Sequence, residues 1–399
     1  MHRMMRLACA AVTLISSAAF AQQTTDNKTI TGHIVQPKLV PASDANLAQL
    51  KVPAGFRVTK YYEGLKHPRV ITVAEDGAVY VTRRDEGDCV LLKDDNNDGT
   101  PDGYVTVARR PQLHGMCLSP DGSKAWFVTI KELFVADRKP DGTFGPLKRL
   151  IDDLPDAGQH NNRTVVYGPD GMLYVSVGST TNSANEENAE AATILRIKPD
   201  GSERSIFARG LRNTIGFVFH PQTNALWGLD NGIDWLGDDD APEELNLIEK
   251  GKNYGWPIVY GKGEINLHPE PPNDLSREEY AKLVTSPVLT YTAHAAPMQM
   301  LFYRGGNFPA EYSGDAFATM RGSWNRLPPS GYEVVRIHFE NNQPVSIKPF
   351  VKGFLIDDGK GGFTQFARPF GLAVMKDGSL LVGGDDNNGV IYRVSYVGK

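Results

Sequence analysis

The segment VVYGPDGMLYVSV, residues 165–177, indicates the fold that this chain is expected to adopt. Apolar runs lie on both sides of Asp170-Gly171, and Asp-Gly between two such runs is the strongest short-range signal for a β-hairpin. The chain therefore contains a strand–turn–strand unit that returns several times. Copies of this unit occur at residues 70–82, 116–129 and 371–383, with a weaker copy at residues 217–229.

The spacing of these units indicates a β-propeller. Successive turns begin at Asp76, Asp121 and Asp170, which are 45 and 49 residues apart. A repeat of about 40 to 50 residues with several strands is typical of propeller blades. We therefore expect an all-β fold, a six-bladed β-propeller of four-stranded antiparallel blades, over residues 51–399. An open pair of β-sandwiches is the alternative. Further strands are expected at residues 317–319 and 334–339, a last unit at 371–396, and an insertion at 257–296.

The N-terminus carries the features of a secretory signal. Arg3 and Arg6 precede a core of apolar and small residues, and Ala19-Phe20-Ala21 has the small-x-small pattern of a cleavage site. We expect residues 1–21 to be removed, residues 22–50 to form an extended arm, and the protein to be periplasmic or secreted. The apolar run is shorter than the roughly 20 residues that a membrane span needs, so we expect no membrane span.

Composition excludes several classes of function. The net charge is −5 and no long basic run is present, which argues against a nucleic-acid partner. The chain has no His-Glu-x-x-His or Cys-x-x-Cys pattern and no G-x-G-x-x-G after a strand, so common zinc sites and a nicotinamide fold are unsupported. Cys89 and Cys117 remain after signal removal, and the sequence leaves a disulfide and two buried free thiols equally open.

The loop from Gly158 to Arg163, GQHNNR, is the first candidate for catalysis because it precedes the third hairpin. Loops that lead into the inner strand of a blade lie at the mouth of the central channel. The nearby Arg163 disfavours further positive charge, so we expect His160 to stay neutral at pH 7 and to be a competent general base. An ordinary exposed histidine is the alternative. His114 and His294 are weaker candidates at other blade entrances.

Two acidic segments predict sites for a hard cation. In DDNNDGTPD, residues 94–102, oxygen-bearing side chains stand at alternate positions before a glycine, as in the first half of a calcium loop. The second segment, residues 230–244, contains clustered carboxylates, which a bound cation would stabilise. A solvated turn or loop is the alternative for each segment. The expected ligands of the first segment are Asp94, Asn96, Asp98 and Asp102.

Three motifs together resemble the soluble sugar dehydrogenases that depend on pyrroloquinoline quinone (PQQ), the glucose/sorbosone dehydrogenase family. The resemblance covers about residues 52–396, and that family is a six-bladed propeller, in agreement with the repeat count. The motifs are Gly210-Leu211-Arg212-Asn213 followed by Gly216, the segment from Glu244-Leu245-Asn246 to Tyr254-Gly255-Trp256-Pro257, and the His160 loop. The segments GSWNR, residues 322–326, and RPFG, residues 368–371, are more similar to the sorbosone-dehydrogenase-like branch.

The resemblance implies a role for each of the matching residues. His160 would be the general base, taking the proton of the substrate hydroxyl while a hydride passes to the quinone. The cofactor calcium would be bound by the main-chain carbonyls of Gly232 and Ile233, where the family usually has Gly-Pro, and Glu244 is also expected to be a metal ligand. The expected cofactor-binding residues are Arg212, Asn213, Arg368, either Arg321 or Arg326 in place of a family lysine, and His114.

The resemblance implies an enzyme that oxidises an aldose or a related sugar with PQQ and calcium. Its electrons would pass to an external acceptor, a cytochrome or a quinone. The loop at residues 179–183 differs from that of the glucose enzyme, which leaves the sugar open. The alternatives are a calcium-dependent lactonase on a six-bladed propeller and a non-catalytic ligand-binding propeller. A lactonase does not need a set of side chains that binds a polyanion. Arg212, Asn213 and Arg368 therefore favour the PQQ-dependent dehydrogenase over both alternatives.

Overall fold

The computed structural model describes residues 30–156 and 158–398. The expected signal peptide and residues 22–29 of the expected arm lie outside these ranges. The described chain consists almost entirely of β-strands, with two α-helices, α1 (Asp44–Leu47) and α2 (Arg277–Ala281), and one 3-10 turn, η1 (Ala310–Tyr312). No helix in these ranges is long and apolar enough to cross a membrane.

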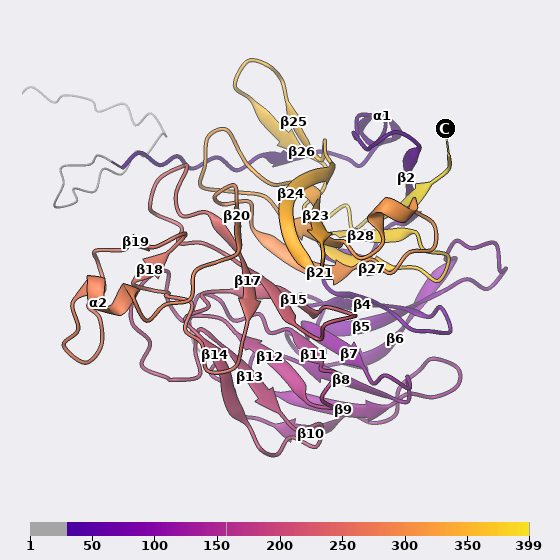
Figure 1. Ribbon diagram of the computed structural model, residues 1–399. Helices are drawn as coiled ribbons and strands as arrows, with labels where there is room; N and C mark the ends of the chain where they lie inside the picture. The colour runs from indigo at the N-terminus through magenta and orange to yellow at the C-terminus, as the bar shows by residue number, and fades with distance from the viewer. Residues whose placement is uncertain (1–29, 157, 399) are drawn as a thin grey trace, which may run out of the picture.

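Six four-stranded antiparallel sheets make up most of the described chain (Figure 1). This confirms the predicted all-β class and the predicted type of sheet. The first three are β3 (Ile71–Val73), β4 (Val79–Arg83), β5 (Asp88–Lys93), β6 (Gly103–Arg109); β7 (Gly115–Leu118), β8 (Lys124–Val128), β9 (Leu133–Asp137), β10 (Lys148–Ile151); and β11 (Val165–Tyr167), β12 (Leu173–Val177), β13 (Thr193–Ile197), β14 (Ser205–Arg209). The others are β15 (Thr214–Phe219), β16 (Leu226–Asp230), β17 (Glu243–Ile248), β20 (Leu289–Tyr291); β21 (Pro297–Phe302), β22 (Ala316–Met320), β23 (Glu333–Glu340), β24 (Gln343–Val351); and β27 (Pro369–Val374), β28 (Leu380–Gly384), β29 (Ile391–Tyr396), β2 (Phe56–Tyr62).

The predicted Asp-Gly hairpins are the first two strands of these sheets. In the hairpin at residues 165–177, β11 pairs with β12 so that Val165 faces Val175 and Tyr167 faces Leu173. Gly171 has a φ of 77°, a left-handed conformation that glycine adopts without a steric penalty. Every residue of β12 is buried, as expected for a strand covered on both faces.

The first strands of the sheets, here called the inner strands, pack on one another around a common centre. β7 packs against β11, β15 against β21, and β27 against both β21 and β3, while β12 contacts β15. One hydrophobic cluster that includes Tyr80, Met116 and Phe127 joins the sheet that begins with β3 to the sheet that begins with β7. In Figure 1 the colour accordingly passes around the molecule from indigo through magenta and orange to yellow.

The last sheet combines both ends of the described chain. β2 comes from near the N-terminus and pairs with β29, the last strand, with Phe56 opposite Tyr396. Phe56 lies in an aromatic cluster with Phe308, Tyr312 and Phe350. The hydrophobic effect of burying these rings therefore holds the N-terminal strand against the end of the chain.

Two regions extend beyond the six sheets. The expected insertion contains α2 and the small sheet of β18 (Val259–Tyr260) and β19 (Glu264–Ile265), and its last part provides β20. Residues 30–50 carry α1 and β1 (Lys38–Leu39), which pairs in parallel with β26 (Phe363–Gln365) beside β25 (Leu355–Asp357). The domain boundary near residue 51 stays a prediction.

The two described cysteines are free thiols. Cys89 is buried on β5, and its sulfur lies 3.6 Å from the sulfur of Met116. Cys117 lies on β7, next to that methionine. Of the two alternatives that the sequence left open, the structure has the free thiols.

Candidate active site

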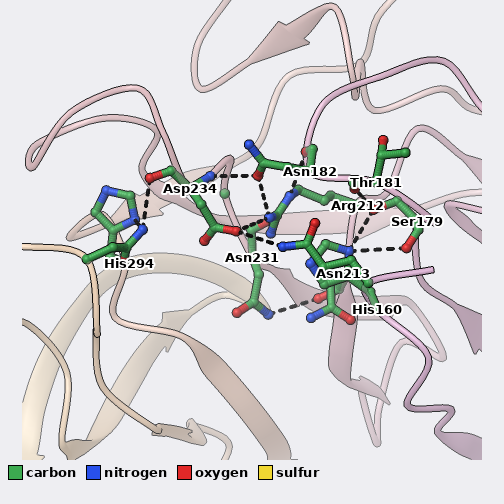
Figure 2. A network of polar contacts seen from close by, with 12 residues as sticks. His160, Ser179, Thr181, Asn182, Arg212, Asn213, Asn231, Asp234 and His294 are labelled. Atoms are coloured by element: carbon green, nitrogen blue, oxygen red, sulfur yellow. Dashed lines mark hydrogen bonds and ion pairs between the residues drawn. The ribbon is translucent and has the colours of Figure 1, made fainter. Parts of the chain in front are cut away.

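Loops before the inner strands of four sheets line a cavity of about 250 Å³, here called the central pocket. His160 precedes β11, Arg212 and Asn213 precede β15, Ala296 precedes β21, and Arg368 precedes β27. These residues meet because the inner strands surround one centre. Figure 2 shows His160, Arg212 and Asn213 side by side at this position.

The imidazole of His160 is held by Ser179, which follows β12. Nδ1 of His160 lies 2.7 Å from Oγ of Ser179 and 3.2 Å from its carbonyl oxygen. The loop fits closely over Gly178, where an added Cβ would lie 2.5 Å from the carbonyl oxygen of His160. Burial and, next, the charge of Arg212 lower the pKa of His160 to about 3. The imidazole is therefore neutral at pH 7, as a general base requires.

Arg163 lowers the pKa of His160 as expected, and it also has a larger structural role. It is the weakest of the charges that lower the pKa of His160, after burial and Arg212. Its guanidinium is fully buried and donates hydrogen bonds to the carbonyl oxygens of His160 (2.7 Å) and Pro155 (2.5 Å). Burial lowers the pKa of Arg163 to about 10, so it remains charged. Arg163 therefore holds the backbone of the His160 loop.

Arg212 is tied into the wall of the central pocket. Its side chain is buried and pairs with Asp234 at 2.7 Å. It also donates to the carbonyl oxygen (3.0 Å) and the side-chain oxygen (2.7 Å) of Asn182. The backbone N–H groups of Arg212 and Asn213 both donate to the buried carboxylate of Asp230, which fixes the turn before β15. Most donors of Arg212 are therefore already engaged within the protein.

Two other arginines give the opposite wall its positive charge. Arg321 and Arg368 line the central pocket, whereas Arg326 is not among its lining residues and pairs with Asp239 at the surface. Arg368 donates to the carbonyl oxygen of Gly322 (2.6 Å), and no ion pair to it is found in the described ranges. Burial and neighbouring Arg321 lower the pKa of Arg368 to about 10, so it is charged at pH 7.

The carboxylate of Asp385 pairs with two arginines of this wall, Arg321 and Arg69. Asp385 has a fully buried side chain, and its oxygens lie 2.6 Å from Nε of Arg321 and 3.0 Å from Nε of Arg69. Burial alone would raise the pKa of Asp385, but these two arginines hold it well below its usual range. With Arg368 added, this wall carries three guanidinium groups. The buried carboxyl groups beside them are Asp385 and Asp386, and Asp386 accepts the backbone N–H of Arg368 at 3.1 Å, so the guanidinium groups are still in excess.

The expected calcium ligands lie in a tight corner beside the central pocket. Gly232 lines the pocket, and the carboxylate of Glu243 accepts its N–H at 2.8 Å. Glu244 accepts the N–H of Gly261 at 2.6 Å and borders a narrow space shared with Ile233. Burial raises the pKa of both glutamates to about 8. Considering only residues 30–156 and 158–398, no group of three His, Cys, Asp or Glu side chains is arranged to hold a metal.

Of the remaining predicted residues, His114 and the 94–102 segment lie outside the central pocket. His114 is buried before β7, and its Nδ1 lies 2.8 Å from the carbonyl oxygen of Arg163. The 94–102 segment is an exposed loop between β5 and β6. There Asp94 accepts the N–H groups of Asp98 (3.1 Å) and Gly99 (2.8 Å). His294 does line the pocket, and its Nε2 lies 2.7 Å from the carbonyl oxygen of Gly237.

Sequence reasoning missed several residues that shape the site. Asp385 was not selected, and Asp234 and Ser179 were noted only as members of the 230–244 and 179–183 segments, because their partners lie in distant segments. Arg69 carried a signal that was available, since it stands two residues before an inner strand, as Arg163 and Arg212 also do. A basic residue at this repeated position could have indicated a ring of positive charge around the centre.

Three comparisons place this geometry among known proteins. Residues 50–397 match the family model described as TrAA12-like. An uncharacterized protein of Borreliella burgdorferi is 30% identical over 379 residues, covering 89% of this chain and 93% of that protein. The PQQ-dependent pyranose dehydrogenase of Coprinopsis cinerea is 23% identical over 405 residues; the match covers 87% of this chain and 54%, about half, of that enzyme.

A solved structure has the same fold. The calcium structure of the Trichoderma reesei carbohydrate-active enzyme of family AA12 superposes with a TM-score of 0.73 at 20% identity, covering 91% of this chain and all of that one. The predicted kinship with PQQ-dependent sugar dehydrogenases is confirmed, while these relatives do not distinguish the sorbosone-like branch. From the match over residues 50–397 and the similarity to the Borreliella protein, the chain belongs to the TrAA12-like family.

Proposed function

We propose that this protein is a PQQ-dependent dehydrogenase that oxidises an aldose or a related sugar. The observation that carries the proposal is the central pocket, which places a neutral His160 opposite the excess positive charge of Arg321 and Arg368. The name of the Coprinopsis relative supports the same cofactor and substrate class. We further propose that the six sheets are the blades of a six-bladed propeller over residues 51–399.

The residues of the central pocket fit PQQ in charge. PQQ carries three carboxylates, for which the planar guanidinium group is a natural bidentate partner. Arg368 has no carboxylate of its own within ion-pair distance in the described part of the chain, and Arg321 shares Asp385 with Arg69. Arg321, rather than Arg326, is therefore the arginine that would stand for the family lysine. Arg212, paired with Asp234, would serve with Asn213 to shape the wall.

The reaction follows from what His160 can do at Nε2. When bound, PQQ supplies a two-electron oxidant that accepts a hydride. His160 would take the proton of the sugar hydroxyl, while the hydrogen on the same carbon leaves with both electrons of its C–H bond. That carbon then becomes a carbonyl carbon, and atoms and charges balance. Arg163 and Ser179 keep the imidazole in place for this transfer.

Calcium fits the main-chain oxygens that the resemblance indicated. Gly232 and Ile233 border the narrow space beside the central pocket, where their carbonyl oxygens would bind a hard cation. A cation near Glu244 would favour its ionised form and offset the burial that raises its pKa. A calcium there would act as a Lewis acid toward a bound ligand. The calcium structure of the Trichoderma neighbour supports calcium as the cation.

The setting of the enzyme follows from the N-terminus and from the reaction. We propose that residues 1–21 are a cleaved signal peptide and that the mature protein is periplasmic or secreted. The electrons would leave to an external acceptor, a cytochrome or a quinone. The lactonase and the non-catalytic alternatives are less favoured, because neither needs the positive wall formed by Arg321 and Arg368.

Reconstitution tests the proposal directly. Purified protein without cofactor is expected to be inactive and to gain dye-linked oxidation of aldoses after incubation with PQQ and calcium. Calorimetry should show PQQ binding in calcium-containing buffer, with weaker binding after a chelator is added. No detectable PQQ binding in the presence of calcium would remove the proposal.

A separate prediction concerns a structural calcium in the 94–102 loop, with Asp94, Asn96, Asp98 and Asp102 as ligands. A ligand that binds only the native state stabilises it by about 2.7 kcal/mol at 100 times its Kd. Chelation should therefore lower the melting temperature, and Asp98→Ala should reduce this response. The matched control is Asp121→Ala, in an ordinary Asp-Gly turn, which should leave the response unchanged. An equal chelator response in Asp98→Ala and wild type would make the loop an ordinary turn.

A further inference from the structure

Ser179 is placed to decide which nitrogen of His160 carries a proton. It is fully buried and makes contacts through its side chain and its backbone. Its N–H donates to the carbonyl oxygen of Arg212 at 2.7 Å, and its carbonyl oxygen accepts the N–H of His160 at 3.1 Å. Its hydroxyl lies 2.7 Å from the carbonyl oxygen of Thr181 and 2.7 Å from Nδ1 of His160. Figure 2 shows Ser179 and Thr181 beside the imidazole.

The number of protons in this chain of contacts is limited. A serine hydroxyl has one proton to donate, and the carbonyl oxygen of Thr181 can only accept. The Ser179 proton therefore points to Thr181, and its oxygen is left to accept a hydrogen bond from Nδ1 of His160. The carbonyl oxygen of Ser179, 3.2 Å from the same nitrogen, is also only an acceptor. Both contacts require a proton on Nδ1.

We infer that Ser179 is a positioning residue that fixes His160 in the tautomer with a proton on Nδ1 and a lone pair on Nε2. A neutral imidazole has a single ring proton, so Nε2 is then free to accept one. His160 lines the central pocket, and no hydrogen bond from Nε2 to another described residue is found. The lone pair is thus available to a hydroxyl group in the pocket.

The contact between Ser179 and His160 differs from a histidine–carboxylate pair in its effect on the charge of the imidazole. Ser179 is neutral, so it orients the ring without favouring the protonated imidazole as a carboxylate would. His160 consequently stays neutral in spite of its fixed hydrogen bond. The inference rests on the proposed function for its catalytic meaning, while the tautomer itself is a property of the protein without cofactor.

The tautomer can be measured directly in protein that contains no PQQ. Nitrogen-15 spectra of histidine-labelled protein near pH 7 distinguish a protonated from an unprotonated ring nitrogen, and comparison with His160→Gln assigns the signals. We expect Nδ1 of His160 to be protonated and Nε2 unprotonated. The opposite tautomer, or an equal mixture of the two, would overturn the inference, whatever the protein oxidises.

A matched pair of variants separates the effect of the Ser179 hydroxyl group from the effect of side-chain size. Ser179→Thr keeps the hydroxyl, and Ser179→Val has nearly the same shape without it. An imidazole held in the wrong tautomer can lose a factor on the order of 10⁴ in rate, and the remaining carbonyl contact should limit the loss. We expect Ser179→Val to mix the tautomers and to lower kcat about 10-fold relative to Ser179→Thr, with PQQ affinity unchanged.

The outcomes distinguish this inference from the proposed function. Equal tautomer populations and equal kcat in the two variants would overturn the role of Ser179. Mixed tautomers with unchanged kcat would support the role of Ser179 and remove His160 as the base. Melting curves of both variants check folding, and the spectrum of the wild-type protein decides the tautomer if neither variant folds.

Discussion

His160→Ala is expected to lower the turnover of the PQQ-loaded protein by a factor of about 100 to 10,000, the usual contribution of a general base. Its affinity for PQQ should stay within a few-fold of the wild type, because the charged wall of Arg321 and Arg368 is intact. Dye-linked kinetics give the turnover, and calorimetry gives the affinity. His338→Ala, on β23 and outside the central pocket, is the control and should leave both values near those of the wild type.

The pH dependence of the wild-type rate provides a second view of the same residue. Because burial lowers the pKa of His160 to about 3, the neutral base is fully present above that value and is lost only as pH falls toward it. The turnover should therefore be nearly constant from about pH 5 to about pH 8. A rate that rises around the ordinary histidine pKa of about 6.5, or near-normal turnover in His160→Ala, would mean that another group is the base.

Arg368→Met is expected to have the second largest effect, on the binding of PQQ. Removing one partner of a buried charge pair typically costs about 2 to 5 kcal/mol, or roughly 30-fold to 4,000-fold in Kd. The methionine keeps much of the apolar length of the side chain, so that mainly the charge and its hydrogen bonds are lost. Titration of PQQ in calcium-containing buffer measures the change, and turnover at saturating PQQ should fall much less.

The matched control removes an arginine charge at a position outside the central pocket. Arg326→Met removes an arginine that pairs with Asp239 and does not line the central pocket. It should alter the PQQ affinity by less than about 3-fold, because exposed ion pairs contribute roughly 0 to 1 kcal/mol. Equal losses in Arg326→Met and Arg368→Met would point to long-range charge rather than contact. Unchanged affinity in Arg368→Met would remove this residue from the cofactor site.

The parts of the fold that could be predicted are those that depend on neighbours in sequence. The turn at Asp170-Gly171 and the apolar runs around it are local, so the hairpin of β11 and β12 could be placed from the sequence. The pairing of β2 with β29 joins segments more than 300 residues apart. No local pattern in the sequence shows whether β2 belongs to the first sheet of the chain or to the last one. Its pairing with β29 was therefore not predicted.

The same limit applies to the site. His160 could be selected because its polar loop precedes a hairpin, and Arg212 because its motif resembles that of a known family. The ion pair of Arg212 with Asp234, and the carboxylate of Asp385 beneath Arg321, depend on how separate loops meet. Arg163 was assigned an effect on the charge of His160, whereas its contacts are with backbone oxygens. Proximity in sequence correctly suggested that Arg163 and His160 interact, but it did not show that Arg163 contacts the backbone oxygen of His160.

The pairing of β2 with β29 has a consequence for biosynthesis. A ribosome makes β2 among the first ordered segments, but its hydrogen-bonding partner emerges only with residues 391–396. Arg368 stands just before β27 of that same sheet, so the positive wall of the pocket is assembled last. A nascent chain that stops even slightly short leaves β2 without a neighbour and exposes an unpaired strand edge. Truncated products should therefore aggregate or be degraded, and should not accumulate as cofactor-binding fragments.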